Sequence, residues 1–279
     1  MTGRPEGPEL ANPRSERVKA VRALAGRSAR LRHGLFLVEG PQGVREAVRW
    51  IPSDVRHVYV ATGQQERRPE IVDEARAAGV PVHSATPDVV RAMSADAQGV
   101  LAVVSDRSVA LADVVAGSPR LVAVLASVRD PGNAGAVIRA ADAAGADAVV
   151  LAGTSVDVRN PKVVRATAGS FSHLPVVTGV GLGEAVAMLR TARLAVLAAD
   201  GAGDLDLDVL LDDGHAAGAD LAAPTAWVFG NEAWGLPEAD AALADAVVRV
   251  PIHGRAESLN LATAAAVCLY ASARAQRRA

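Results

Sequence analysis

The sequence predicts an α/β protein with two domains, the second built on a mainly parallel sheet. Short apolar segments alternate with helix-like segments along most of the 279 residues. Hydrophobic residues make up 50% of the chain, which is enough for a full core at this length. A segment rich in serine, aspartate and glycine interrupts the alternation at residues 107–118, and we place a linker there.

The first part of the chain predicts a small domain over residues 14–106. Residues 1–13 contain three prolines and little apolar content, which is typical of a mobile tail. Between Arg14 and Ala25 the residues Val18, Val21 and Leu24 recur at helical spacing among basic residues, so we expect a basic amphipathic helix. Strands follow at 36–40, 55–61, 80–82 and 100–104, and helices at 44–50, 70–78 and 88–93.

From residue 119 the alternation resumes and continues to the end of the chain. Strands are expected at 121–126, 147–151, 175–178, 194–198, 226–229 and 247–250, and helices at 134–144, 160–168, 183–190, 237–244 and 258–275. The acidic segment 200–220 is predicted to be a loop. Repeated alternation of this kind predicts a parallel sheet covered by helices on both faces.

Composition excludes several classes of protein. A single cysteine rules out a disulfide framework and a cysteine-rich metal site, and Cys268 lies among apolar residues, so we expect a packed structural thiol and no metal. No apolar run approaches the roughly 18 residues that span a bilayer, and the polar N-terminus lacks the apolar segment of a signal peptide. We therefore expect a soluble, cytoplasmic protein.

The charge of the chain is unevenly distributed, although its formal net value is only -2. Between residues 14 and 32 one acid, Glu16, accompanies seven bases: Arg14, Arg17, Lys19, Arg22, Arg27, Arg30 and Arg32. Such a cluster can attract a phosphate backbone while the whole molecule stays soluble. A solvated helix face explains any single arginine about as well. The same two interpretations apply to a second basic group, Arg159, Lys162 and Arg165.

Three strand ends carry small and polar residues where a ligand could bind. The strand at 121–126 leads into DPGNAG and a helix on which Arg139 is the strong hydrogen-bond donor among apolar residues. Because burying an unpaired arginine is costly, Arg139 should face a carboxylate or a ligand phosphate. A plain strand-to-helix turn would also account for the glycines and Asn133.

The other two strand ends lie in the last fifty residues. Gly230 follows an apolar strand and would let a ligand approach the backbone, and Glu232 can accept hydrogen bonds or pair with a cation. Ser258 or Asn260 could cap the final helix, contact substrate, or do both. In open α/β sheets, ligands bind at the carboxyl ends of strands, so we expect these segments to converge.

The motifs DPGNAGAVIRAADAAG, VFGNEAWGLP and VRVPIHGRAESLNLATAAAVCLY resemble the three motifs of the SpoU/TrmH family of RNA ribose methyltransferases, in the SPOUT superfamily. The resemblance covers residues from about 119 to 275. It implies a C-terminal α/β trefoil-knot domain that binds S-adenosyl-L-methionine largely through backbone groups, and a homodimer whose site is completed across the interface. The segment RLRHGLFLVEGPQGVREAV also resembles the start of the family's small α/β substrate-binding domain.

The same resemblance assigns roles to residues. It places cofactor binding at Gly230, Val250, Ile252 and Leu259, and catalysis at Arg139, Asn133, Glu232, Ser258 and Asn260. RNA contacts are expected from the charge pattern itself, at Arg14, Arg17, Arg22, Arg27, Arg30, Arg32 and Arg165. The reaction would transfer a methyl group to a ribose 2'-hydroxyl in RNA. Because an arginine stays protonated, we interpret Arg139 as a clamp on phosphate and developing oxyanion and not as a base.

Alternatives come from other classes. A dinucleotide-binding oxidoreductase is disfavoured because the glycines between Gly179 and Gly183 do not open a helix directly after a strand. Ribosomal RNA is the favoured substrate because of the N-terminal domain, with transfer RNA as the alternative. A non-catalytic RNA-binding protein of the same fold is disfavoured because every polar residue of the family's site is present.

Overall fold

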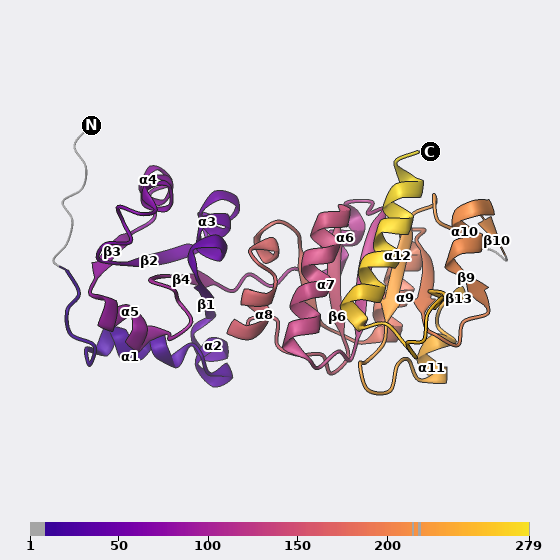
Figure 1. The fold of residues 1–279 in the computed structure, drawn as a ribbon, viewed down its shortest axis with the longest axis horizontal. Coiled ribbons are helices and arrows are strands. Elements are labelled where there is room, and N and C mark those ends of the chain that lie inside the picture. Colours follow the sequence, from indigo (N-terminus) through magenta and orange to yellow (C-terminus); the bar gives the residue numbers. More distant parts are fainter. Residues whose placement is uncertain (1–8, 214, 217–218, 279) are drawn as a thin grey trace. The chain divides into compact units, whose positions relative to one another are not determined.

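The computed structural model describes residues 9–213, 215–216 and 219–278, apart from the side chains of 213, 215 and 216 (Figure 1). These residues form two compact units. The first contains the chain up to Arg107 together with Arg159–His173, and the second contains Ser108–Val158 and the chain from Leu174 onward. The first unit therefore includes a segment that we had predicted as part of the second domain.

The first unit is a four-stranded sheet covered on both faces. Its strands β1 (Leu35–Glu39), β2 (Val55–Ala61), β3 (Val82–Ala85) and β4 (Val100–Ser105) lie in the order β1-β4-β2-β3. Only β2 and β3 run parallel; the other neighbours are antiparallel. Its helices are α1 (Glu16–Ala23), α2 (Arg27–His33), α3 (Pro41–Trp50), α4 (Pro69–Ala77), α5 (Pro87–Met93) and α8 (Pro161–Ala166).

Alternation along the strands produces two apolar layers in this unit. Val38 faces the layer that contains α3, α4 and Val164 of α8. Leu37 points to the opposite layer, which contains α1 and α5. The sheet is thus buried on both sides, and α8 supplies part of the cover.

Two predicted boundaries, those of the N-terminal tail and of the linker, need correction. Leu10 forms a bridge with Ala85, so residues 9–13 do not fit a mobile tail, and residues 1–8 lie outside the described part. The basic helix predicted between Arg14 and Ala25 is observed as α1, and a second short basic helix, α2, follows Gly26, its N-cap residue. The predicted linker contains α6 (Leu111–Ala116), whose Leu111 is buried in the core of the second unit.

The second unit is built on a seven-stranded sheet in the order β7-β6-β5-β12-β8-β13-β9. Every pair of neighbouring strands in it is parallel, which confirms the predicted parallel sheet. The strands are β5 (Leu121–Ala126), β6 (Ala148–Ala152), β7 (Val176–Val180), β8 (Ala195–Ala199), β9 (Leu205–Asp206), β12 (Thr225–Phe229) and β13 (Ala246–Arg249).

Helices cover both faces of this sheet. One face packs against α6 and α9 (Leu182–Thr191), and the other against α7 (Pro131–Ala144) and α12 (Leu261–Gln276), which lie side by side (Figure 1). On the second face the buried Trp227 indole donates a 2.9 Å hydrogen bond to Ser272 of α12. A short helix α11 (Glu238–Ala241) precedes β13.

The acidic segment 200–220 is not the loop that we predicted. It contains β9, helix α10 (Leu207–Asp213) and the short strands β10 (His215–Ala216) and β11 (Ala219–Asp220). Leu207 and Leu210 are each only 1% exposed. Asp208 and Asp212 are exposed, whereas Leu207 and Leu210 are buried, so the acidic composition concealed this helix.

The chain after β13 returns across the sheet. β13 lies two strands beyond β12 in the sheet, yet α12, which follows β13, packs on β12, β5 and α7. Residues 250–260 must therefore cross the carboxyl ends of β8 and β12. No helix within the described residues is long and apolar enough to cross a membrane.

Candidate functional site

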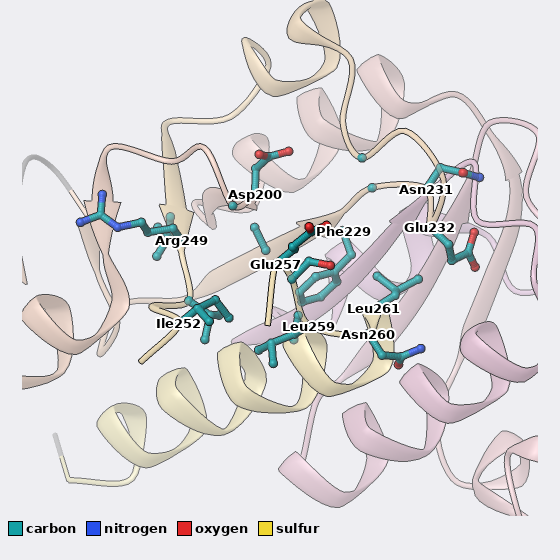
Figure 2. A pocket seen from close by; sticks show the side chains of 18 of the residues that line it. Asp200, Phe229, Asn231, Glu232, Arg249, Ile252, Glu257, Leu259, Asn260 and Leu261 are labelled. Carbon is teal, nitrogen blue, oxygen red and sulfur yellow. The ribbon is translucent and has the colours of Figure 1, made fainter. Parts of the chain in front are cut away.

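A cavity of about 770 Å³ lies at the carboxyl ends of β8, β12 and β13 (Figure 2). Its walls come from the loops that follow those strands, residues 199–201, 229–235 and 248–252, and from residues 257–261 at the start of α12. Figure 2 shows Glu232 and Asn260 at one end of the cavity and Arg249 at the other. Residues 250–260, which cross the strand ends, thus form one wall of a cavity large enough for a small-molecule ligand.

Gly230 sits where two backbone segments almost touch. A Cβ atom at this position would lie 2.4 Å from the carbonyl carbon of Gly235. Asn231 and Gly235 hold the two segments together with reciprocal backbone hydrogen bonds of 3.0 and 2.9 Å. The Asn231 amide also donates to the Ser127 carbonyl at 2.7 Å. Glycine is therefore required here by packing inside the loop.

A hydrogen-bond network connects the three predicted motifs. The Asn133 side chain accepts from the Asn260 amide at 2.9 Å and donates to Glu232 at 3.4 Å. Glu232 also accepts from the backbone N-H groups of Arg129 and Asp130, at 3.4 and 3.2 Å. The carboxylate thus fixes the entry to α7, and the motifs, remote in sequence, meet at one end of the cavity.

Both helices that meet at this network have a side-chain cap. Asp130 accepts from the backbone N-H of Asn133 at 2.7 Å, and Asn260 accepts from that of Ala262 at 2.9 Å. Asn260 therefore caps α12, as one of its two interpretations predicted, and also contacts Asn133; its contact with substrate stays a prediction. The cap also explains why α12 begins at Leu261 and not at residue 258.

Eight of the nine predicted catalytic and cofactor residues line the cavity. They are Asn133, Gly230, Glu232, Val250, Ile252, Ser258, Leu259 and Asn260. Asp200, Arg249 and Glu257 line it too, although we had not singled them out. Asp200 shares the signal of the other motifs, since it follows an apolar strand directly.

Arg139 lies outside this wall. It is exposed on α7, because Gly135, Ile138 and Ala141 occupy the buried side of the helix. The expectation of a carboxylate or phosphate partner assumed a buried arginine and is corrected, because water solvates the exposed guanidinium; among the described residues Arg139 has no carboxylate partner.

The basic residues of the first unit divide into two groups. Arg14, Arg17, Arg22, Arg27 and Arg32 are exposed, as contact with a phosphate backbone would require. Arg30 is only 6% exposed and donates to the carbonyls of Leu24 and Ala25 at 3.1 and 2.7 Å, so its predicted role in RNA contact is corrected to closing α1. Arg165 forms ion pairs with Glu39 and Asp96.

The one cysteine is packed as predicted. Cys268 is buried in α12, and burial raises the pKa of its thiol to about 12. A thiol of this kind is a poor nucleophile at neutral pH. Across the described ranges, no cluster of three or more histidine, cysteine or acidic side chains could hold a metal ion.

A parallel sheet, a C-terminal chain that turns back across its strand ends, and a ligand-sized cavity walled by three loops define an α/β-knot methyltransferase of the SPOUT class. The sequence profile of the SpoU rRNA Methylase family matches residues 120–270, and that of the MRM3-like substrate binding domain matches residues 15–102. The chain belongs to the SpoU rRNA methylase family.

Individual relatives agree with this assignment. The chain is 30% identical over 246 residues to the 23S rRNA (guanosine-2'-O-)-methyltransferase RlmB of Bordetella pertussis, covering 85% of this chain and 96% of the relative. It is 29% identical to the 23S rRNA (uridine(2479)-2'-O)-methyltransferase of Streptomyces viridochromogenes, covering 95% and 96%.

A solved structure extends the agreement to the cofactor. The SpoU methyltransferase AviRb from Streptomyces viridochromogenes, in complex with AdoMet, superposes with a TM-score of 0.79 at 31% identity, covering 95% of this chain and 100% of that one. The predictions of an RNA 2'-O-methyltransferase that uses S-adenosyl-L-methionine are confirmed.

Proposed function

We propose that this protein transfers a methyl group to a ribose 2'-hydroxyl of ribosomal RNA in the cytoplasm, with the cavity at the ends of β8, β12 and β13 holding S-adenosyl-L-methionine. The observation that carries the proposal is the network of Asn133, Glu232 and Asn260. It unites three motifs that contact one another at the edge of a single cavity.

The cavity fits the cofactor in size and in chemistry. Its volume of about 770 Å³ falls within the range of small-molecule sites, and Ile252 and Leu259 give it apolar walls. The bound cofactor supplies a methyl group on a positively charged sulfonium. Asp200, Glu232 and Glu257 line the cavity, whereas the one lining base, Arg249, is paired with Asp206 at 3.1 Å. This excess of carboxylates favours a cationic ligand.

Arg139 has a different task in this proposal. Its guanidinium stays protonated, so it cannot accept the proton of the 2'-hydroxyl. It can bind the phosphate of the target nucleotide and stabilise negative charge that develops on the attacking oxygen. Because Arg139 lies outside the cavity wall, we propose that it completes the site of a second subunit in a homodimer.

The exposed surface of α12 supports a homodimer. Val267 and Tyr270 are 39% and 50% exposed, which is high for large apolar side chains. Tyr270 donates to the Ala143 carbonyl of α7 at 3.1 Å, so this apolar surface continues onto the helix that carries Arg139. A two-fold contact through α7 and α12 would bury it and bring Arg139 into the interface.

The substrate is proposed to be ribosomal RNA because two relatives of nearly equal similarity act on 23S rRNA. The match to a substrate-binding domain over residues 15–102 agrees with this proposal. One of those relatives modifies guanosine and the other uridine, so similarity does not select the base.

The role of Arg139 can be tested by comparing Arg139→Ala with Arg193→Ala. Arg193 is exposed and precedes β8, at the opposite end of the sheet from the cavity. Incorporation of a tritiated methyl group into protein-free 23S rRNA should be abolished in R139A and unchanged in R193A. Binding of S-adenosylhomocysteine, measured by calorimetry, should be unchanged in both. Undiminished turnover in R139A would refute the assignment.

A mixing experiment tests the shared site. R139A and a cofactor-site variant, G230A, should each be inactive alone. In a mixture of the two, about half of the dimers are mixed and each carries one intact site, so about a quarter of the wild-type activity should return. No recovery, with mixed dimers demonstrated by differently tagged subunits, would place Arg139 and the cofactor in the same subunit.

A further inference from the structure

Trp234 lies at the edge of the cavity but is not part of its wall. It stands between Glu232 and Gly235, which both line the cavity, whereas Trp234 itself does not. Its side chain is 51% exposed, while Trp227 of β12 is fully buried. Figure 2 shows Asn231 and Glu232, which lead to Trp234, at the end of the cavity where the three motifs meet. An indole is thus exposed beside the hydrogen-bond network of the site.

The loop that carries Trp234 is closed and anchored. Asn231 and Gly235 exchange backbone hydrogen bonds of 3.0 and 2.9 Å, so the residues between them form its tip. Asn231 is buried, and its side chain accepts from the Ala233 N-H at 2.9 Å while it donates to the Ser127 carbonyl at 2.7 Å. The backbone of Trp234 is therefore held in place before any ligand binds, which lowers the entropic cost of binding.

The guanidinium of Arg129 lies over the indole of Trp234. Its Cζ atom is 5.1 Å from the ring centroid, which is within the range of a cation–π interaction. The backbone N-H of Arg129 donates to Glu232 at 3.4 Å, but its exposed side chain has no carboxylate partner in the described part of the chain. The pair therefore combines an aromatic face with a positive charge that no acid neutralises.

Such a pair matches the chemistry of a nucleotide. Bases that leave an RNA helix stack on aromatic side chains and on guanidinium planes, and the charge of an arginine attracts the adjoining phosphate. Since the guanidinium takes one face of the ring and half of the side chain is still exposed, ring surface remains for one more planar group. Stacking of this kind accepts any of the four bases, because each has a π face.

The proposed reaction gives such a surface a use. The methyl group would be held among the loops that wall the cavity, and the attacking 2'-oxygen must come within about 3.5 Å of it. A nucleotide that turns out of the RNA brings its ribose to this point, but its base then loses its stacking neighbours. A platform that replaces those neighbours raises the population of the reactive arrangement.

We propose that Trp234 is the platform on which the base of the target nucleotide stacks while its ribose enters the cavity. Trp234 contacts the base, and Arg129 acts through the ring as a positioning residue. This inference rests on the proposed function and adds to it the side chains that hold the target nucleotide.

A second subunit is the other surface that could cover Trp234. The exposed apolar side chains that favour a homodimer, Val267 and Tyr270, lie elsewhere. Tyr270 donates to Ala143 in the last turn of α7, whereas Arg129 precedes the first turn. With 14 residues, α7 is about 21 Å long. An unpaired charge is also costly to bury in an apolar interface, so the nucleotide is the better occupant.

The test compares Trp234→Phe with Trp234→Leu in the full-length protein. Both variants remove the indole and keep an apolar side chain, but only phenylalanine keeps an aromatic face. With protein-free 23S rRNA and saturating enzyme, the single-turnover rate of methylation should fall about tenfold in W234L and stay within about threefold of the wild type in W234F. The dissociation constant for the RNA, measured by filter binding, should change less than about twofold in both, because backbone contacts dominate RNA affinity.

Arg129→Ala, alone and combined with Trp234→Leu, tests the pair. R129A should lower the same rate about threefold in the wild-type background and leave it unchanged in the W234L background, because the guanidinium acts through the ring. Equal losses in both backgrounds would show that Arg129 contacts the RNA by itself and would overturn its positioning role.

Further measurements separate the platform from other roles of Trp234. The affinity for S-adenosylhomocysteine and the melting temperature should equal those of the wild type in W234L, so a lower rate would not come from a damaged cofactor site. Equal rates in W234L and the wild type, or equal losses in W234L and W234F, would overturn the platform alone. So would dissociation of the homodimer in both variants, observed by sedimentation, because Trp234 would then belong to a subunit interface. Methylation by the wild type tests the proposed function itself, and its absence would remove both proposals.

Discussion

Replacing Gly230 with alanine should damage the cavity at the ends of β8, β12 and β13 through a clash between identified atoms. The new Cβ would lie 2.4 Å from the carbonyl carbon and 2.5 Å from the carbonyl oxygen of Gly235, whereas ordinary contacts begin at 3.4 Å. Backbone must therefore move by about 1 Å, since no flexible side chain can yield. Overpacking of this kind costs about 2 kcal/mol, and a 1 Å displacement beside Glu232 should lower turnover about 100-fold.

The matched control is Gly201→Ala. Gly201 lines the same cavity, but a Cβ atom there would meet nothing within 4 Å. Calorimetry should show the melting temperature of G230A lowered by about 4–8 °C and that of G201A unchanged. Titration with S-adenosylhomocysteine should show weakened binding for G230A only. Wild-type stability, cofactor affinity and methylation in G230A would refute the packing argument.

Two further predictions concern titratable groups. Because burial raises the pKa of Cys268 to about 12, iodoacetamide should not modify this thiol at pH 8 in the native protein but should do so in urea; rapid native modification would contradict its burial. Burial, with His57 and Arg17 nearby, lowers the pKa of His83 from 6.5 to about 4. As the pH falls below 6.5, His83 is protonated in the unfolded chain before it is in the folded one, so the free energy of unfolding decreases toward pH 4. Urea unfolding at pH 7 and pH 5 should show this decrease in the wild type. In His83→Gln the decrease should be smaller by about 1 kcal/mol.

Most strands could be predicted from the sequence because each is a short apolar run bounded by polar or turn-forming residues. The predicted and observed bounds of β5 coincide at Leu121–Ala126. Helix α10 could not be predicted in this way, since its acids outnumber the leucines that bury it. The composition of a short surface segment is dominated by its exposed side chains. A few buried apolar side chains are enough to hold such a helix against the core.

The sequence predicted most of the residues that line the cavity, but not the hydrogen bonds that join them. Gly230 and Leu259 line the cavity as their motifs indicated. The hydrogen bond between Asn133 and Asn260 joins residues separated by 127 positions, and only the return of the chain after β13 brings them together. For Arg139 the motif singled out the residue but not the direction of its side chain. That direction depends on which side of α7 packs on the sheet.

The docking of α8 against β1 has a consequence for how the chain is made. Val164 fills part of the apolar layer behind Val38, and Arg165 neutralises Glu39, whose side chain is only 4% exposed. During synthesis, the first hundred residues leave the ribosome long before this cover exists. A nascent chain that stops at Arg107 therefore carries a bare apolar patch and an unmatched buried acid, and it can close its first core only after some sixty further residues have been translated.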